Sequence, residues 1–514
     1  MKVYKLGKFN TEIMAKQTYN LKKYNLKPNR KINGWTLVSR LGNGGNGEVW
    51  KCRNARMEEY AIKILIMVSS DSYKRFYDEV VFMERYAGTM GVIPIVDKYI
   101  PEYSKRYSNL SLPFFFVMPL ASPIEKLIDK MPIDKKLEMI KNLLRILTEL
   151  HSKGIAHRDI KPANIMLCNG DYVLSDFGLV FFQNKTFKTP PGSKLGARTT
   201  IAPQMQRDAV TADKYKADVY SMAKTIWMIL TEDLKSFDGQ YKINSAFGLR
   251  QLMTEKGVYW YPLEKLLIRC TDLNESARPS ADELEKGFTE WLDINGNWER
   301  QNLIQWQEVQ EQLFPSYVPS HAEWTDVDDI VSVLNLVGQY DSLNHLFFPD
   351  GGGLDLTGAS KSYEHGCMEL YFEELVYIVK PKCLFYEYIE NTCEWNYFYL
   401  ELDELNAVTP DLQIECYAEE LCEMAPLKYY SLEVMENMSQ QDYVRLRPRH
   451  IVRYLKGSLV VFHKNSIYNR KVAKYQGEHS KYTASDFRQY IVQLAGKYKE
   501  NHDDVKEKSN LKKE

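Results

Sequence analysis

The sequence predicts an α+β protein with at least two domains, and three observations support this class. The 514 residues exceed the length of an ordinary single domain. Residues 301–440 hold 4 Lys and Arg against 26 Asp and Glu, whereas the segments before and after them carry a net positive charge. Charge shifts of this size usually mark domain boundaries. Strand patterns followed by a helical one lie between Trp35 and Ala87, and aromatic strand patterns mixed with helical ones lie in the second half.

The composition excludes several classes of protein. An apolar fraction of 44% and a charged fraction of 26% are ordinary for a globular chain. The longest apolar runs, Ile62–Val68 and Leu112–Ala121, are far shorter than the roughly 20 residues that span a bilayer. The N-terminus lacks the apolar core of a secretory signal, and basic residues form no single stripe of the kind that binds nucleic acid. We therefore expect a soluble, cytoplasmic protein without a nucleic-acid partner.

The first informative element is a glycine-rich turn between two predicted strands. Trp35–Leu41 has a strand pattern, and a second strand pattern runs from Glu48 to Cys52. Glycines at positions i, i+2 and i+5 between strands let backbone N–H groups approach phosphate oxygens. An ordinary glycine-rich hairpin explains the same pattern, whereas a dinucleotide-binding fold would need a helix in place of the second strand. The segment reads Gly42-Asn43-Gly44-Gly45-Asn46-Gly47.

The second element is a lysine in the middle of an apolar strand. Lys63 lies within Tyr60–Leu65, where an unpaired ammonium group would be costly to bury. The next segment, Ser72–Ala87, has apolar residues at i, i+4, i+7 and i+11, which predicts a helix. Glu79 lies beside that apolar stripe, so we expect it to pair with Lys63. An exposed edge-strand lysine and a surface glutamate are the simpler alternatives.

Two further motifs complete the pattern. The run His157–Asn164 reads H-R-D-I-K-P-A-N, and Asp176-Phe177-Gly178 begins twelve residues after Asn164. Together with the glycine-rich turn and the Y-A-I-K strand, these motifs resemble a eukaryotic-type (Hanks-type) serine/threonine protein kinase over about residues 31–292. The resemblance implies a bilobal protein-kinase fold, followed here by a separate α+β domain with an antiparallel sheet. It extends to Ala202-Pro203-Gln204, Asp218–Ser221 and Arg278-Pro279-Ser280.

The resemblance also implies the chemistry of the motif residues. Asp159 would accept the proton of the substrate hydroxyl, and Lys161 would neutralise the γ-phosphate of ATP. Asn164 and Asp176 would hold Mg²⁺, which prefers hard oxygen ligands. A lysine at position 161 is typical of the members that act on serine and threonine. We therefore expect an ATP- and Mg²⁺-dependent enzyme that phosphorylates Ser or Thr hydroxyls of protein substrates.

The nucleotide site can be located in the same way. Lys63, fixed by Glu79, would bind the α- and β-phosphates. The strand Phe114–Met118 would end at the gatekeeper Met118, and the hinge would follow it. Pro119 lacks an N–H group, but only its carbonyl is needed there. The other expected contacts to ATP are Ala121 in the hinge, Val49, Ala61 and Met166 around the base, and Glu125 at the ribose.

Two positions depart from the family pattern. Ala197 stands where these kinases usually have a threonine, whose hydroxyl bridges Asp159 and Lys161. Gln204 replaces the usual glutamate, so its contact with Arg278 would be a hydrogen bond that is about 1–2 kcal/mol weaker than an ion pair. Neither change removes a phosphate or metal ligand, so we expect an active kinase. A catalytically silent pseudokinase scaffold that binds nucleotide or partners is the alternative.

Arg158 directly precedes the expected catalytic aspartate. The resemblance implies that an arginine here pairs with a phosphorylated residue of the loop 179–200, which is rich in threonine and positive charge. We expect autophosphorylation in this loop, with a purely structural Arg158 as the alternative. The candidate acceptors are Thr186, Thr189, Ser193, Thr199 and Thr200, of which Thr189 and Ser193 are preferred.

The second half of the chain resembles no known family. A connecting helix is expected near Leu303–Leu313, and Lys456-Gly457 is expected to join a strand pair. The strand predictions are a meander of Glu369–Val379, Cys383–Ile389 and Glu394–Leu400, and the pair Val452–Tyr454 and Ser458–His463. Helical patterns lie near Ala418–Met424 and Ser485–Lys497.

These observations give a set of expected domain boundaries. A basic arm would cover residues 1–30, and the kinase domain would cover 31–295, with lobes at 31–120 and 121–295. A C-terminal α+β recognition or regulatory domain would cover 296–497, and a charged, disordered tail would cover 498–514. The acidic C-terminal domain would bind a partner or ligand, or dock on the basic kinase half.

Overall fold

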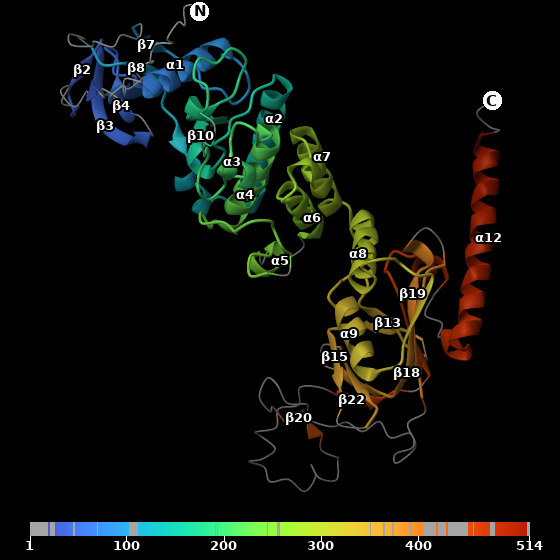
Figure 1. Ribbon diagram of the computed structural model, residues 1–514. Coiled ribbons are helices and arrows are strands. Elements are labelled where there is room, and N and C mark those ends of the chain that lie inside the picture. Colours follow the sequence, from blue (N-terminus) through green and yellow to red (C-terminus); the bar gives the residue numbers. More distant parts are fainter. Residues whose placement is uncertain are drawn as a thin grey trace, which may run out of the picture. The chain divides into compact units, whose positions relative to one another are not determined.

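The computed structural model forms two units, Met1–Asn295 (unit 1) and Gly296–Glu514 (unit 2) (Figure 1). The structure describes residues 19–20, 26–44, 47–68, 70–101, 112–190, 192, 194–243, 245–253, 258–349, 351–362, 365–372, 375–389, 393–403, 418–419, 428–429, 451–455, 457–472 and 478–510. Among these residues, no helix is both long and apolar enough to cross a membrane.

Unit 1 begins with a six-stranded antiparallel sheet in the order β2-β3-β4-β5-β8-β7. Side chains alternate between the two faces of these strands. Trp50, Ile62 and Val117 pack into a hydrophobic core on one face, which leaves Ala61 and Lys63 on the opposite face. The strands are β2 (Lys31–Ile32), β3 (Trp35–Gly44), β4 (Gly47–Arg53), β5 (Glu59–Leu65), β7 (Asp97–Tyr99) and β8 (Phe115–Pro119).

Helix α1 (Ser70–Arg85) follows the sheet and supplies Phe76, Val80 and Met83 to the main core of unit 1. A short strand pair lies before it: β1 (Tyr19–Asn20) pairs with β6 (Met67–Val68). These two residues of the expected N-terminal arm are therefore paired with the rest of the unit.

The rest of unit 1 is mainly helical (Figure 1). Helix α4 (Lys214–Thr231) is its central element, since every residue from Ala217 to Leu230 is buried. Helices α2 and α7 pack against α4 and against each other. The other elements are α2 (Ile133–Ser152), α3 (Pro203–Arg207), α5 (Leu249–Leu252), α6 (Tyr261–Cys270), α7 (Ala281–Asn295) and a small sheet of β9 (Ser122–Pro123), β10 (Ile165–Cys168) and β11 (Asp171–Leu174).

Among the described residues, unit 2 combines two main sheets and the two-stranded sheet of β20 (Ala418–Glu419) and β21 (Lys428–Tyr429) with three long helices. The larger main sheet has the order β12-β18-β19-β23-β13-β14, and the smaller has the order β15-β16-β17-β22. Helix α12 (Ala484–Asn510) packs Phe487 and Ile491 against Tyr397, Tyr399 and Phe462 of the larger sheet. The other elements include α8 (Trp298–Leu313), α9 (Val327–Gly338), β12 (His321–Trp324), β13 (His345–Phe347), β14 (Gly353–Asp355), β15 (Gly358–Lys361), β16 (Met368–Phe372), β17 (Leu375–Val379), β18 (Pro381–Glu387), β19 (Tyr397–Leu402), β22 (Ile451–Tyr454) and β23 (Ser458–Phe462).

The expected meander in this unit is only partly correct. The segment Glu369–Val379 is a hairpin of two strands, β16 and β17, and not one strand. The chain then changes sheet, because β17 belongs to the smaller sheet while β18 pairs with β19 in the larger one. Pro381 stands at this change, and a proline cannot donate a hydrogen bond to a continued ladder.

Three other expectations for unit 2 are wrong. Strands β22 and β23 are not partners, since β22 lies parallel to β17 while β23 pairs with β19 and β13. Ala418–Glu419 is a short strand paired with Lys428–Tyr429, and the rest of the expected helix lies outside the described residues. Helix α12 continues to Asn510 where a disordered tail was expected from residue 498, because Lys and Glu are good helix formers as well as charged.

Candidate active site

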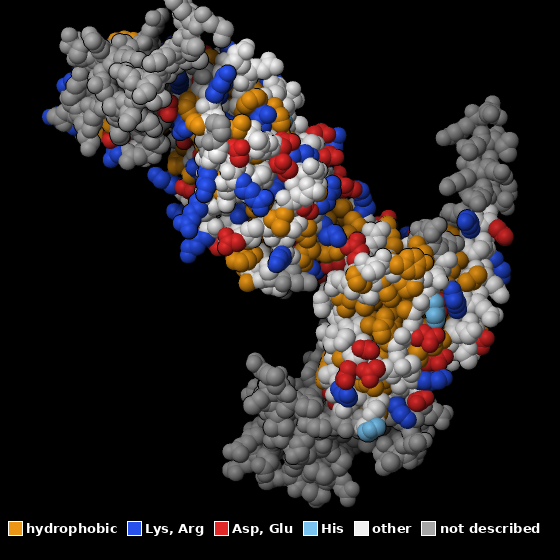
Figure 2. Space-filling view, viewed as in Figure 1, with side chains coloured by type: hydrophobic (Ala, Val, Ile, Leu, Met, Phe, Trp, Pro, Cys, Tyr) orange, Lys and Arg blue, Asp and Glu red, His pale blue; other side chains and the backbone are white. Residues whose placement is uncertain are grey.

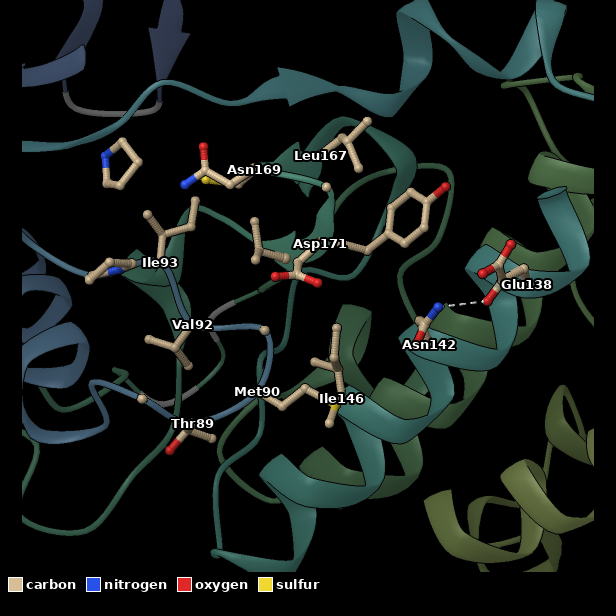
Figure 3. Close-up of a pocket in the computed structure, with 18 of the residues that line it drawn as sticks. Thr89, Met90, Val92, Ile93, Glu138, Asn142, Ile146, Leu167, Asn169 and Asp171 are labelled. Atoms are coloured by element: carbon tan, nitrogen blue, oxygen red, sulfur yellow. Dashed lines mark hydrogen bonds between the residues drawn. The ribbon is translucent and has the colours of Figure 1, made fainter. Parts of the chain in front are cut away.

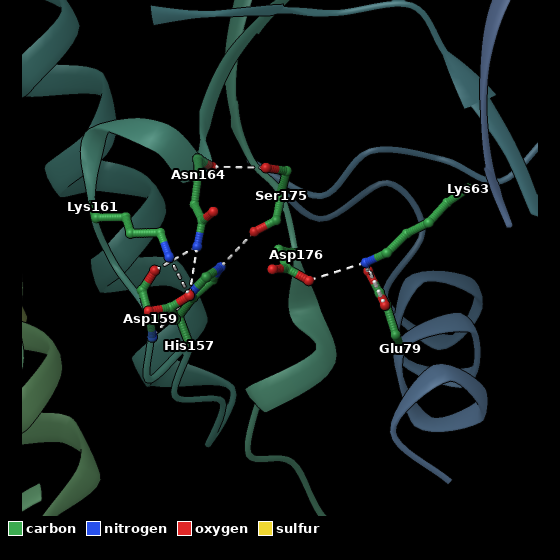
Figure 4. A network of polar contacts seen from close by, with 8 residues as sticks. All are labelled: Lys63, Glu79, His157, Asp159, Lys161, Asn164, Ser175 and Asp176. Atoms are coloured by element: carbon green, nitrogen blue, oxygen red, sulfur yellow. Dashed lines mark hydrogen bonds and ion pairs between the residues drawn. The ribbon is translucent and has the colours of Figure 1, made fainter. Parts of the chain in front are cut away.

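Three elements of unit 1 bring a lysine and two carboxylates together (Figure 4). Lys63 on β5 donates to both oxygens of Glu79 on α1, at 2.6 and 2.8 Å. It also donates to Asp176, which follows β11, at 3.0 Å. The Lys63 and Glu79 side chains are only 9% and 5% exposed. The structure thus brings Lys63 and Glu79 into the pair expected from their sequence positions.

Burial and charge act in opposite directions on this group. Burial disfavours the charged lysine, but the carboxylates of Asp176 and Glu79 outweigh it and raise the pKa of Lys63. Burial raises the pKa of Glu79, and Lys63 offsets part of that effect. Lys63 lowers the pKa of Asp176. The lysine therefore stays charged, which a phosphate-binding role requires.

A second polar cluster lies in the loop before β10 (Figure 4). Lys161 donates to the Asp159 carboxylate at 2.9 Å. The Asn164 amide nitrogen donates to the same carboxylate at 2.9 Å and to the Asp159 backbone carbonyl at 2.8 Å. Asp159 and Asn164 are 7% and 6% exposed. Their side chains are therefore held in one fixed arrangement.

This loop is anchored by Asp218, a residue to which the sequence analysis assigned no role of its own. Asp218 is fully buried on α4, and its two carboxylate oxygens accept the backbone N–H groups of His157 and Arg158, both at 2.7 Å. Arg158 has a positive φ of 65°, a conformation that costs energy and recurs at functional sites. The buried carboxylate stabilises this strained backbone next to Asp159.

Asp176 is positioned from both sides. It has a left-handed backbone conformation, with φ of 58°. Phe177 after it is buried against Phe82 and His157, with ring centroids 4.6 and 5.2 Å apart. The Ser175 backbone N–H before it donates to the Asn164 carbonyl at 2.8 Å. Asp176 and Asn164 are thereby fixed on adjoining segments.

The expected adenine-site residues lie on one face of the sheet. In the ladder of β4, β5 and β8, Val49 is opposite Lys63, and Ala61 is opposite Met118. Directly opposed residues point to the same side of a sheet, so these four side chains share the face that carries Lys63. Met166 on β10 pairs with Pro123 of β9, just after the expected hinge Pro119-Leu120-Ala121, and Glu125 is exposed in the short helix Ile124–Lys126.

The glycine-rich turn is described in part. Strand β3 ends at Gly44 and β4 begins at Gly47, while Gly45 and Asn46 lie outside the described residues. Gly42 and Asn43 pair with Val49 and Glu48 in this hairpin. A Cβ on Gly47 would lie 2.5 Å from the Ile64 carbonyl oxygen, so the close approach of β5 requires glycine there.

The donor atoms of this site fit ATP with Mg²⁺. The Asn164 amide nitrogen is used by Asp159, which leaves its carbonyl oxygen for a cation. Asp176 contacts Lys63 through one oxygen, which leaves the second one. Two hard oxygen donors on adjoining segments suit Mg²⁺, whose other ligands are normally phosphates and water. Asn164 and Asp176 would hold the ion, and Lys63 would contact the phosphates.

The two departures from the family pattern have local consequences. The Gln204 side-chain carbonyl accepts from Arg278 at 3.1 Å, but its amide nitrogen is buried without a partner among the described residues. Ala197 has no hydroxyl to offer Asp159. The buried Thr200 hydroxyl instead donates to the Ile160 carbonyl at 2.8 Å, so it serves the backbone of the catalytic loop.

Arg158 lies in a group of basic side chains. Its guanidinium donates to the Leu179 carbonyl at 2.8 Å and reaches the Thr189 hydroxyl at 3.5 Å. Burial lowers the pKa of Arg158 to about 10. Burial, with Arg158 nearby, lowers the pKa of Lys185 to about 8. Of the other expected acceptors, Thr186 is exposed, Thr199 is half-buried, Thr200 is buried, and Ser193 lies outside the described residues.

Two side chains that hold this loop carry no signal in the sequence. Asp78 on α1 is 1% exposed and accepts the backbone N–H groups of Thr186 and Phe187, at 2.9 and 2.7 Å. Arg75 on the same helix lies over the Phe187 ring, 4.6 Å from its centroid. Both look like ordinary polar positions of an amphipathic helix, so only the tertiary structure identifies them.

A cavity of about 820 Å³ lies outside this cluster (Figure 3). It is lined by the loop 88–94, by α2 and by the β10–β11 turn, with Val92, Ile93 and Ile146 on its apolar side. Asn142, Asn169 and Asp171 provide polar groups. None of the motif residues lines it, although Pro119 of the expected hinge does.

Comparison with known proteins agrees with this geometry. The profile of the protein kinase domain family matches residues 35–288. A protein of Acanthamoeba polyphaga mimivirus is 28% identical over 272 residues, which are 50% of this chain and 16% of that protein. It is named as a candidate serine/threonine-protein kinase/receptor. The serine/threonine-protein kinase PknD of Mycobacterium tuberculosis is 27% identical over 213 residues, 38% of this chain and 29% of its own.

The serine/threonine-protein kinase PrkC of Bacillus subtilis is 25% identical over 186 residues, which are 35% of this chain and 28% of that protein. This chain thus spans less than a third of the length of each of these three relatives. No family profile matches unit 2. Residues 35–288 belong to the protein kinase domain family, of the eukaryotic (Hanks) type.

Proposed function

We propose that the protein is an ATP- and Mg²⁺-dependent serine/threonine protein kinase. The observation that carries this proposal is the joint arrangement of the two clusters, Lys63 with Glu79 and Asp176, and Asp159 with Lys161 and Asn164. Phosphoryl transfer needs positioned phosphates and neutralised charge more than covalent help from the protein. Both clusters hold the side chains that would supply these functions in defined positions.

Each residue has one task in this reaction. Lys63 binds the α- and β-phosphates, and Asn164 and Asp176 hold the metal that ATP brings. Lys161 neutralises the γ-phosphate. The bond between the γ-phosphorus and the bridging oxygen breaks while the substrate hydroxyl oxygen attacks, and Asp159 accepts the hydroxyl proton. The products are ADP and a phosphorylated Ser or Thr.

Intact-mass spectrometry of the purified full chain with and without Mg-ATP tests this function, because it reports phosphate gained by the protein or by an added peptide. Asp159→Asn should abolish the transfer and change ATP affinity by no more than a few fold, since Asp159 handles the hydroxyl and not the nucleotide. Undiminished phosphate incorporation by Asp159→Asn would refute this assignment. Binding of Mg-ATP without transfer by the wild type would favour the pseudokinase alternative.

We further propose that phosphorylation of Thr189 regulates the enzyme. Its hydroxyl lies next to Arg158, and burial lowers the pKa of Arg158 by more than the Asp218 carboxylate raises it. Lys185 shares this environment, and the buried Nε of Arg75 has no partner among the described residues. A phosphate adds about −1.5 to −2 charges and several acceptor oxygens, which these cations would bind. Peptide mapping after incubation with Mg-ATP tests it.

A further inference from the structure

The segment that follows Asp176 has an unusual charge composition. From Phe177 to Arg207 it contains five basic residues and no Asp or Glu. Lys185 is partly buried, whereas the other four are exposed. Their charge is therefore available to a molecule that binds on this surface. The exposed cations are Lys188, Lys194, Arg198 and Arg207.

Arg198 lies beside the catalytic loop. The backbone N–H groups of Thr200 and Ile201 both donate to the Ala197 carbonyl, at 3.1 and 2.8 Å, so residues 197–201 form a turn with Arg198 near its crown. Thr200 is bonded to the Ile160 carbonyl on one side of this turn. On the other side, a Cβ on Gly196 would lie 3.5 Å from the Arg158 carbonyl oxygen.

Arg158 and Ile160 are the two neighbours of Asp159, so the turn adjoins the residue that meets the substrate hydroxyl. A peptide whose hydroxyl reaches Asp159 therefore passes next to Arg198. The guanidinium of Arg198 and the ammonium of Lys194 have no partner among the described residues. Lys161, in contrast, is already bound to Asp159.

Nearby carboxylates do not neutralise these cations. Asp208, which follows the segment, accepts the backbone N–H groups of Gly192 and Val210, at 3.2 and 3.0 Å, and the Thr211 hydroxyl. These hydrogen bonds lower the pKa of Asp208, led by the one from Val210, and hold it within its own loop. Glu125, the exposed acid of the hinge side, is the expected ribose contact. The segment Phe177–Arg207 thus brings five basic and no acidic side chains to this side of the catalytic loop.

On the basis of the proposed kinase function, we propose that the protein substrate is acidic, with Asp or Glu close to the acceptor hydroxyl, and that Arg198 and Lys194 contact those carboxylates. The group transferred is the γ-phosphoryl of ATP, which moves to the Ser or Thr oxygen while Asp159 takes the proton. Arg198 and Lys194 affect substrate binding, whereas Asp159 and Lys161 contact the groups that react. Substrate choice therefore follows electrostatic complementarity.

The same preference bears on the chain's own threonines. Lys188 precedes Thr189, so a free peptide with that sequence would be a poor substrate. Phosphorylation of Thr189 in the protein would therefore depend on its high effective concentration, because the loop is held on the same molecule as the active site. Thr325 in unit 2 has the opposite surroundings. It is exposed, and Glu323, Asp326, Asp328 and Asp329 flank it.

Peptides of residues 319–332 provide a direct test with the full-length protein. The natural acidic peptide is compared with a neutral version, in which each Asp and Glu is replaced by Asn or Gln, and with a lysine version. We expect kcat/KM to be about tenfold higher for the acidic peptide than for the neutral one, and lowest for the lysine peptide. The difference should shrink at about 0.5 M salt, which screens exposed charges.

Variants of the protein test which residues cause the preference for the acidic peptide. Arg198→Ala combined with Lys194→Ala should remove most of the acidic preference through KM, with less than about a twofold effect on the neutral peptide. Arg56→Ala combined with Lys27→Ala, an equal loss of charge at two exposed positions before α1, should retain the preference. Thermal unfolding of the three proteins checks that they are folded.

The outcomes separate the two proposals. No phosphate on any peptide or on the protein itself would overturn the kinase function. Transfer that occurs but uses the neutral peptide as well as the acidic one, or an acidic preference that persists in the double variant, would overturn the substrate preference alone.

Discussion

Unit 2 pairs its buried Glu387 with Arg488 and His321, at 3.0 and 2.7 Å, much as unit 1 pairs its buried charges, but it also buries two histidines without an acidic partner among the described residues. In unit 1, Lys63 meets Glu79 and Asp176, and fully buried Glu264 accepts from Tyr241 and Arg250 at 2.8 and 2.9 Å. In unit 2, His463 and His479 are 1% and 2% exposed, and burial lowers the pKa of each to about 4. The first arrangement keeps charges in place for chemistry, while the second enforces neutral side chains.

This difference shows that the charge count of a region does not indicate whether its buried groups have partners of opposite charge. Residues 301–440 are strongly acidic, yet acid groups do not compensate the two buried histidines of unit 2. Figure 2 shows Lys and Arg side chains spread over unit 1 and a broad hydrophobic area on the visible face of unit 2. The exposed apolar side chains of unit 2 include Trp298 and Tyr317. We propose that unit 2 binds a partner, as expected from the sequence. Its exposed apolar side chains support this proposal.

The largest expected effect comes from removing a charge that unit 1 holds in place. Asp176→Ala takes away a metal ligand and one of the two anions around Lys63, so turnover should fall by about 10²–10³-fold. Mg²⁺-dependent ATP affinity should fall with it, as calorimetry would show. Asp171→Ala, an exposed aspartate of the same hairpin, is the matched control. Unchanged Mg²⁺-dependent binding by Asp176→Ala would contradict the metal assignment.

Acid should destabilise unit 2 through its histidines. The unfolded chain binds their protons near the usual pKa of about 6.5, whereas the folded state resists protonation down to about 4. The contribution of each buried histidine to the free energy of unfolding is therefore fully present above about pH 6.5. It is lost as the pH decreases towards 4, and the loss is about 3 kcal/mol for each histidine. Asp176, with its lowered pKa, loses its contribution only at still lower pH.

Hydrogen exchange of the full chain at several pH values would measure this effect, because peptides from each unit are resolved separately. Unit 2 should open before unit 1 as the pH drops, and His463→Gln should reduce the pH dependence. If hydrogen exchange changed equally in the two units between pH 6.5 and 4.5, the proposed role of the two histidines in the pH dependence of unit 2 would be wrong.

Regulation by Thr189 should give a smaller effect. Phosphatase treatment of the autophosphorylated enzyme should lower peptide phosphorylation by about tenfold, and Arg158→Ala should make activity insensitive to the treatment. Lys185, with a pKa of about 8, loses its charge as the pH rises, so an unphosphorylated enzyme should bind added phosphate less well above pH 8. Arg145→Ala, on the exposed side of α2, should keep the sensitivity. Full activity without phosphate in this loop would show that the loop is ordered by other means.

The smallest effect is expected at a departure from the family pattern. Gln204→Glu gives Arg278 a carboxylate partner and removes a buried amide nitrogen that has no partner among the described residues. We expect unit 1 to gain about 1 kcal/mol. Thermal unfolding would show a rise of a few degrees, and a lower melting temperature would show that the glutamine is favoured by its surroundings. Gln206→Glu, at an exposed position of the same helix, is the control.

Much of unit 1 can be predicted from the sequence because its patterns are local. The alternation in β4 and β5 and the apolar spacing in α1 place Lys63 and Glu79 on facing elements, and the pairing of the two follows. The kinase family is shown by the profile match, as the motifs indicated. Asp218 and Asp78 could not be assigned, because the backbone N–H groups that donate to them are 60–61 and 108–109 residues away in the chain.

In unit 2 the sequence predicted the strands β16–β19, β22 and β23 in approximate position, but it predicted neither the strands β12–β15 nor the pairing of the later strands. β22 and β23 are separated by only three residues in the sequence, a spacing that normally predicts a hairpin, yet each strand belongs to a different sheet. Strand patterns report burial on one face, whereas pairing depends on non-local contacts. The parallel pairing of β17 with β22 joins residues more than 70 positions apart, which no local pattern can indicate.

The anchoring of His157 and Arg158 on Asp218 has a consequence for exchange kinetics. Both amide protons point at a buried carboxylate on the most buried helix of unit 1, so solvent reaches them only when α4 separates from the catalytic loop. Their exchange should be among the slowest in unit 1, and nucleotide should protect the glycine-rich hairpin without altering these two amides. The catalytic loop would thus remain structured in molecules whose first sheet has opened, ready to accept nucleotide when the sheet closes again.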